Sequence, residues 1–159
     1  MFRKILVPMD FEDVARRPLE YGLELARAGR GKVVLLAVID DSFPNPDILS
    51  FQAPWANYYS HLRDEAQKRL GALTGQIGAT GDEVEVCIVH GNPAKMILRF
   101  AEEEACDLVI MATHRTSALR HALVGSVTRK VLAQASPPVM VVHLHEGAEK
   151  RSPEEQEPE

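Results

Sequence analysis

Short apolar runs alternate with longer amphipathic patterns along the chain. The short runs are rich in β-branched residues, which predicts strands. The second and fourth are almost wholly apolar, as in strands covered on both faces of a sheet. In the third run apolar and polar residues alternate, which predicts a half-exposed strand at a sheet edge. The five predicted strands comprise residues 5–7, 32–39, 84–88, 108–111 and 139–142.

Between these runs, apolar residues recur at the spacing of amphipathic helices. Asn92 before Pro93 is predicted to cap the third helix, and Ser126 to cap the fourth. The aromatic residues at the start of the second helix, Trp55, Tyr58 and Tyr59, are expected to pack against the core rather than to cover a pocket or a dimer groove. The apolar positions of the four predicted helices span residues 19–26, 62–77, 94–101 and 127–135.

The alternation of strands and helices predicts an α/β fold. We expect a single doubly wound domain, in which helices cover both faces of a five-stranded parallel sheet. This domain is assigned to residues 1–145. Residues 146–159 are charged and contain proline, so they are interpreted as a disordered tail.

Composition and net charge argue against some classes of binding partner. The 159 residues carry a net charge of −5, which argues against non-specific binding to nucleic acid, because such binding depends on Lys and Arg. No apolar run approaches the roughly 20 residues of a membrane-spanning helix, so we expect no membrane partner. Cys87 and Cys106 lack the spacing of a metal site or a disulfide framework, which favours a reducing cytoplasm.

Asp10 directly follows the first predicted strand. In an open parallel sheet, ligands bind beyond the carboxyl ends of the strands, where the strand order reverses. A carboxylate at that point can accept hydrogen bonds from ribose hydroxyls or from an adenine amine. It can equally bond nearby backbone amides and begin the first helix, and position alone leaves both interpretations open.

The segment after the fourth strand favours an anionic ligand. Residues 111–130 contain no Asp or Glu, although the protein as a whole is acidic. Gly125 and Ser126 stand where a helix begins, and the amides and dipole of a helix N-terminus attract phosphate. The same dipeptide is also a common helix cap without a ligand. The basic residues of the segment are His114, Arg115, Arg120, His121, Arg129 and Lys130.

Several motifs taken together resemble the universal stress protein family. The run MATHR at 111–115, then nine residues, then GSV at 125–127 is similar to that family's phosphate loop, Gly-x-x-Gly, nine residues, Gly-Ser. The run ILVPMD at 5–10 looks like the family's first strand with its aspartate on the adenine side. Matches at 90–94 and 136–139 extend the similarity from about Arg3 to Val142.

The resemblance implies a strand order of 3-2-1-4-5 and an adenine nucleotide, ATP or AMP, in those members of the family that bind one. It also implies homodimers joined through the fifth strand at Val139, Met140, Val141 and Val142. The residues expected beside the adenine and ribose are Pro8, Met9, Asp10 and Val38. Those expected on the strand-four loop and the phosphate side are Met111, Ala112, His114, Arg115, Gly125, Ser126 and Val127.

Two positions depart from the pattern of the nucleotide-binding members. Ala112 replaces the first glycine of the loop and adds only a methyl group. Arg115 replaces the second glycine; at a positive φ it would cost about 1–2 kcal/mol and bring its Cβ into phosphate space. A guanidinium beside phosphates could instead supply bidentate hydrogen bonds. The sequence leaves both effects open.

Two functional hypotheses follow. The first is a cytoplasmic dimer that binds ATP, ADP or AMP, with or without Mg²⁺, and acts as a stress sensor on an unknown regulatory protein. The second is a dimeric interaction module of the same family that binds no nucleotide. The chain has no Gly-Lys-Ser/Thr phosphate loop and offers no nucleophile paired with a base, so we expect any ATP hydrolysis to be slow.

Overall fold

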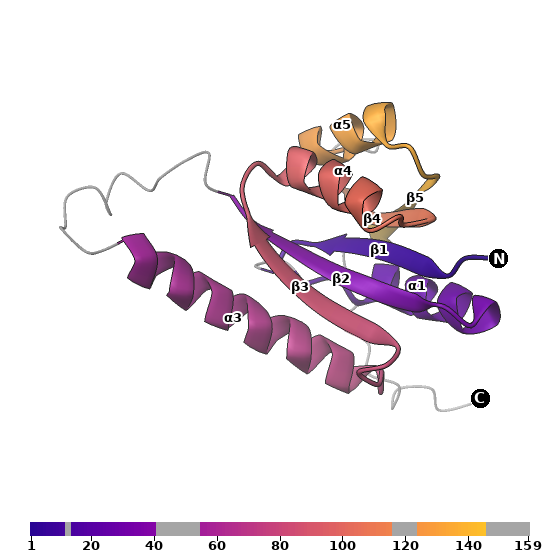
Figure 1. Cartoon of the computed structure of the whole chain (residues 1–159), viewed down its shortest axis with the longest axis horizontal. Helices are drawn as coiled ribbons and strands as arrows, with labels where there is room; N and C mark the ends of the chain where they lie inside the picture. The colour runs from indigo at the N-terminus through magenta and orange to yellow at the C-terminus, as the bar shows by residue number, and fades with distance from the viewer. Residues whose placement is uncertain (12–13, 41–54, 116–123, 146–159) are drawn as a thin grey trace, which may run out of the picture.

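The computed structural model describes residues 1–11, 14–40, 55–115 and 124–145. These residues form a five-stranded parallel sheet in the order β3-β2-β1-β4-β5, with helices on both faces (Figure 1). The predicted fold class and strand order are confirmed. The strands are β1 (Lys4–Met9), β2 (Lys32–Ile39), β3 (Val84–His90), β4 (Leu108–Arg115) and β5 (Val139–His145). The helices are α1 (Arg16–Gly29), α3 (Trp55–Gln76), α4 (Pro93–Glu103) and α5 (Ser126–Gln134). The predicted tail at 146–159 lies outside the described residues.

Two apolar clusters lie on opposite faces of the sheet. Ile5 and Val7 of β1 belong to the cluster under α1 and α3, whereas Leu6 between them belongs to the cluster under α4 and α5. Figure 1 shows these two pairs of helices on opposite sides of the strands. Because successive side chains of a strand point to opposite faces, a central strand here must be apolar at every position.

The sequence pattern predicted which strand lies at a sheet edge, but it did not predict where all the strands end. β3 lies at one edge of the sheet and is mostly half-buried or exposed, as its alternating pattern predicted. β4 and β5 extend further than their apolar runs, and their pairing continues to Arg115 opposite His145. The added residues of β4 begin with Ala112 and Thr113 and end with polar side chains. These residues belong to β4 because they pair with β5, and the apolar pattern of the sequence does not predict this pairing.

The N-termini of α4 and α5 are capped differently. The Asn92 side chain accepts a hydrogen bond from the backbone amide of Lys95 at 3.2 Å, and Pro93 occupies the first turn, as predicted. At α5 the prediction was wrong by one residue: Gly125 is the N-cap, it makes no side-chain bond, and Ser126 is already helical. Glycine is an acceptable N-cap, so the helix can begin before the serine hydroxyl is in a capping position.

The turn from α1 into β2 passes close to the start of β1. Arg30 adopts a left-handed conformation, with φ of 53°, and its amide bonds to the carbonyls of Ala26 and Arg27. A Cβ on Gly29 would lie 2.0 Å from the carbonyl oxygen of Phe2, and one on Gly31 would lie 2.4 Å from that of Arg3. Both glycines are therefore required by close approach of two backbones.

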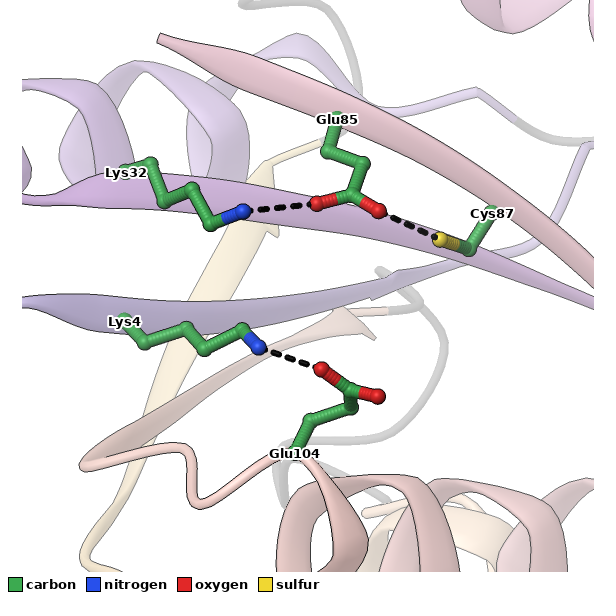
Figure 2. A network of polar contacts seen from close by, with 5 residues as sticks. All are labelled: Lys4, Lys32, Glu85, Cys87 and Glu104. Atoms are coloured by element: carbon green, nitrogen blue, oxygen red, sulfur yellow. Dashed lines mark hydrogen bonds and ion pairs between the residues drawn. The ribbon is translucent and has the colours of Figure 1, made fainter. Parts of the chain in front are cut away.

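Charged side chains gather at the amino ends of the strands, as Figure 2 shows. Lys4 pairs with Glu104, and Lys32 pairs with Glu85 at 2.8 Å. Cys87 donates to Glu85 at 3.7 Å, and burial followed by the Glu85 carboxylate raises the pKa of its thiol. Exposed pairs of this kind contribute little to stability, and a thiol with a raised pKa is a poor nucleophile.

Candidate functional site

A cavity of about 520 Å³ opens at the carboxyl ends of β1 and β2 and beside the middle of β4, where Met111 and Ala112 line it. Its volume lies in the range of small-molecule sites. The wall is mainly apolar, with a few polar groups. The lining residues are Pro8, Met9, Asp10, Phe11, Ala15, Leu36, Val38, Ile39, Asp40, Tyr58, Leu62, Pro93, Ile97, Met111, Ala112 and Val127.

The cavity lies where β1 and β4 separate. These two strands pair only at Ile5 with Leu108 and at Leu6 with Val109. On its other side, β1 stays paired with β2 as far as Met9. Beyond the short ladder, Pro8 and Met9 form one lip of the cavity and Met111 and Ala112 form the other. This is the point of strand-order reversal at which open parallel sheets bind ligands.

Two carboxylates line the cavity, each directly after one of two neighbouring strands. Asp10 directly follows β1, and Asp40 directly follows β2, the neighbouring strand. Both residues are exposed rather than buried. Carboxylate oxygens only accept hydrogen bonds when ionised, so this part of the wall suits a ligand that carries hydroxyl or amine donors.

The N-terminus of α5 approaches the same cavity through Val127. The first turn of α5 contains no acidic residue, and Arg129 and Lys130 are exposed in the next turn. The helix dipole favours negative charge on this side. The cavity thus combines acceptors near β1 and β2 with a positive end near α5.

Seven of the eleven residues expected beside the nucleotide line this one cavity. They are Pro8, Met9, Asp10, Val38, Met111, Ala112 and Val127. Gly125 and Ser126 immediately precede Val127 but are exposed and do not belong to the lining. β4 ends with His114 and Arg115, whose side chains lie outside the described part of the structure. Arg120 and His121 lie wholly outside the described residues.

Sequence reasoning missed the contribution of the helices to the cavity. Tyr58 and Leu62 reach it from α3, and Pro93 and Ile97 reach it from α4. The expectation that Tyr58 packs against the core rather than covering a pocket was wrong. Its neighbour Tyr59 does pack against the core, and the two rings meet edge to face with centroids 5.8 Å apart.

Asp40 could have been found by the signal that identified Asp10. It is the first residue after a buried parallel strand, and the strand before it neighbours β1. The helical residues had no such signal, because nothing in their spacing states which end of the sheet a helix covers.

Metal-binding clusters and membrane-spanning helices are both absent from the described part of the chain. No three His, Cys, Asp or Glu side chains in that part of the chain come together in a group that could hold a metal ion. None of the described helices combines the length and the apolar character that a membrane crossing requires.

Residues 1–143 match the family model of the universal stress proteins. The chain belongs to the universal stress protein family. Among curated relatives, universal stress protein MJ0577 of Methanocaldococcus jannaschii is 30% identical over 154 residues, which cover 89% of this chain and 95% of that protein. Universal stress protein YxiE of Bacillus subtilis is 26% identical over 148 residues, covering 89% of this chain and 99% of its own.

Solved structures of universal stress proteins have the same fold. The structure of MJ0577 matches with a TM-score of 0.67 at 31% identity, and covers 91% of this chain and 97% of that one. A universal stress protein crystallised in complex with cAMP matches with a TM-score of 0.55 at 26% identity, over 89% of this chain and 97% of that one.

At the two positions where this universal stress protein departs from the family loop, the backbone is extended. Ala112 and Arg115 both lie in β4, paired with Val142 and His145 of β5. Among the described residues other than glycine, positive φ occurs only at Arg30 and Ala105. The strain that Arg115 would carry at a positive φ therefore does not arise.

Proposed function

We propose that this universal stress protein binds an adenine nucleotide, ATP, ADP or AMP, in the 520 Å³ cavity between β1 and β4. The observation that carries the proposal is that both lips of the cavity consist of residues that the family motif assigns to the nucleotide. Asp10 and Asp40 would accept hydrogen bonds from the base or the ribose. The N-terminus of α5 would face the phosphates.

The binding of a nucleotide by a relative supports this class of ligand. The structural relative that was crystallised with cAMP holds an adenine nucleotide on the same fold. Since no three-residue metal cluster occurs among the described residues, Mg²⁺ would enter with the phosphates rather than at a prepared site. We infer that the output is a regulatory contact with another protein in the stress response, and not turnover.

Titration calorimetry with ATP and with AMP, each with and without Mg²⁺, tests the proposal. Asp10→Asn should weaken binding by about 10- to 100-fold, because it removes a charged hydrogen-bond acceptor. Asp82→Asn is the matched control: it removes the same charge from an exposed residue close before β3, away from the cavity, and should leave binding unchanged. Absence of heat at millimolar ATP and AMP would contradict the proposal.

The departures at Ala112 and Arg115 favour a second candidate, a dimeric interaction module that binds no nucleotide. Both residues continue β4 as a regular strand in place of a glycine loop. Arg115→Gly separates the candidates. It should strengthen or restore ATP binding if the arginine obstructs the phosphates, and weaken it if the guanidinium holds them.

Two further features belong to the proposal. A homodimer through β5 is supported by the position of this strand at the sheet edge and by the exposure of Met140. A cytoplasmic location is supported by Cys87 and Cys106, which are both free thiols.

A further inference from the structure

The backbone groups of β1 alternate between its two neighbours. The carbonyl of Arg3 accepts from the amide of Lys32, at the start of β2, at 2.8 Å. The carbonyl of the next residue, Lys4, accepts from the amide of Asp107, just before β4, at 2.9 Å. Because this alternation continues along a strand, the backbone groups of Leu6 and then Pro8 face β4.

The backbone groups of β4 alternate in the same way. The amide of Val109 donates to the carbonyl of Pro138, just before β5, at 3.0 Å. Ile110 and Ala112 therefore turn their backbone groups toward β1. In this register, the next rung of the ladder after Leu6 requires the amide of residue 8 to donate to the carbonyl of Ile110.

Residue 8 cannot supply that rung. The nitrogen of a proline carries no hydrogen, and proline is normally confined to edge strands or to breaks in a ladder. β1 is the central strand of the sheet, and its pairing with β4 ends at Leu6. Its pairing with β2 continues through Pro8, opposite Leu36, because the backbone of Pro8 faces away from β2.

We propose that Pro8 is a positioning residue that ends the β1–β4 ladder and so keeps the cavity between the two strands open. Pro8, Met111 and Ala112 all line this cavity. The carbonyl of Pro8 and the amide of Ala112 would form the following rung if the ladder continued. With the ladder interrupted, both groups face the space between the strands and are placed for a ligand.

The test replaces Pro8 by residues that restore the missing donor. Pro8→Ala adds an amide and removes the ring, whereas Pro8→Val adds the amide and keeps most of the apolar volume. Pro138→Ala is the control, because its backbone also faces β4 but at the amino end of β5, away from the cavity. The measurements are amide hydrogen exchange by NMR, the midpoint of urea unfolding, and ATP affinity.

In both variants at residue 8 we expect the new amide to be protected from exchange and the unfolding midpoint not to fall. The affinity for ATP should drop by about fivefold, because one added hydrogen bond favours the closed arrangement of the strands. The control should keep the affinity of the unaltered protein.

Two results would overturn the inference. One is a freely exchanging amide at residue 8 in Pro8→Val. The other is a loss of ATP affinity in Pro8→Ala but not in Pro8→Val, which would show that residue 8 acts only through apolar contact with the ligand. Only the affinity measurement rests on the proposed function. If the unaltered protein binds no ATP, that function fails, and hydrogen exchange at residue 8 still decides the role of Pro8.

Discussion

At the scale of single residues, this protein contains some glycines that the fold requires and others that it only tolerates. Gly29 and Gly31 lie where the end of α1 crosses the first residues of the chain, and a Cβ at either would overlap backbone atoms. Gly71 and Gly75 lie inside α3 with nothing within 4 Å of an added Cβ. The same residue type thus has opposite effects on stability at the two places.

The matched substitutions Gly29→Ala and Gly71→Ala measure this difference. Gly29→Ala should destabilise the protein by about 1–3 kcal/mol, since the backbone must move to accept the methyl group. Gly71→Ala should stabilise it by about 0.5–1 kcal/mol, because glycine loses more conformational freedom in a helix than alanine. Urea unfolding of both variants checks the pair, and equal midpoints would contradict the argument.

At the scale of elements, one ion pair ties the end of α1 to the turn before β3. Arg27 donates to the carboxylate of Glu83 at 2.7 and 3.2 Å. Glu83 also accepts from the backbone amide of Thr80 at 3.0 Å. The hydrogen bond from Arg27, followed by that from Thr80, lowers the pKa of Glu83 from 4.5 to about 2.

This pKa gives stability a definite pH dependence. A carboxyl group whose pKa is lowered on folding stabilises the folded state fully above its ordinary pKa of 4.5, and this contribution is lost as the pH falls toward about 2. Glu83→Gln should therefore lower the urea midpoint at pH 7 and reduce its fall between pH 4.5 and 2. Glu24→Gln, at an exposed position of α1, is the control. A pH profile for Glu83→Gln that parallels that of the unaltered protein would show that the pair does not act this way.

At the scale of the whole molecule, the position of β5 at the edge of the sheet bears on the proposed dimer. The carbonyl of Pro138 faces β4, so Met140 and Val142 turn their backbone groups to β4 while Val141 turns its groups outward. An antiparallel partner strand would bond to Val141. Proline is tolerated on an edge strand when the lost amide faces away from the sheet.

Val141→Pro should therefore give a folded monomer if two copies pair through β5. Met140→Pro is the comparison, because it removes an amide that faces β4 and should destabilise the fold itself. Light scattering at micromolar concentration, with circular dichroism for folding, distinguishes the two variants. An unaltered protein that is monomeric, or a Val141→Pro variant that is still dimeric, would rule out this interface.

The sequence by itself determined the layers of this protein and one half of its candidate site. Apolar runs give the strands, and uninterrupted runs such as that of β2 mark burial on both faces, because side-chain alternation is a local property. Asp10 could be placed at the carboxyl end of its strand for the same reason, whereas Met111, the last residue of the predicted run, lies in the middle of β4. Pro8 is likewise a local signal, since a missing donor is a property of one residue.

Only the tertiary structure decided how far the strands run and what closes the cavity. β4 continues to Arg115 because β5 pairs with it there, and the short ladder between β1 and β4 opens the space that the nucleotide is proposed to fill. Tyr58 and Ile97 reach that space because α3 and α4 pack over its two sides. Register and helix placement depend on contacts between residues far apart in the chain, and a local pattern of apolar and polar positions does not encode them.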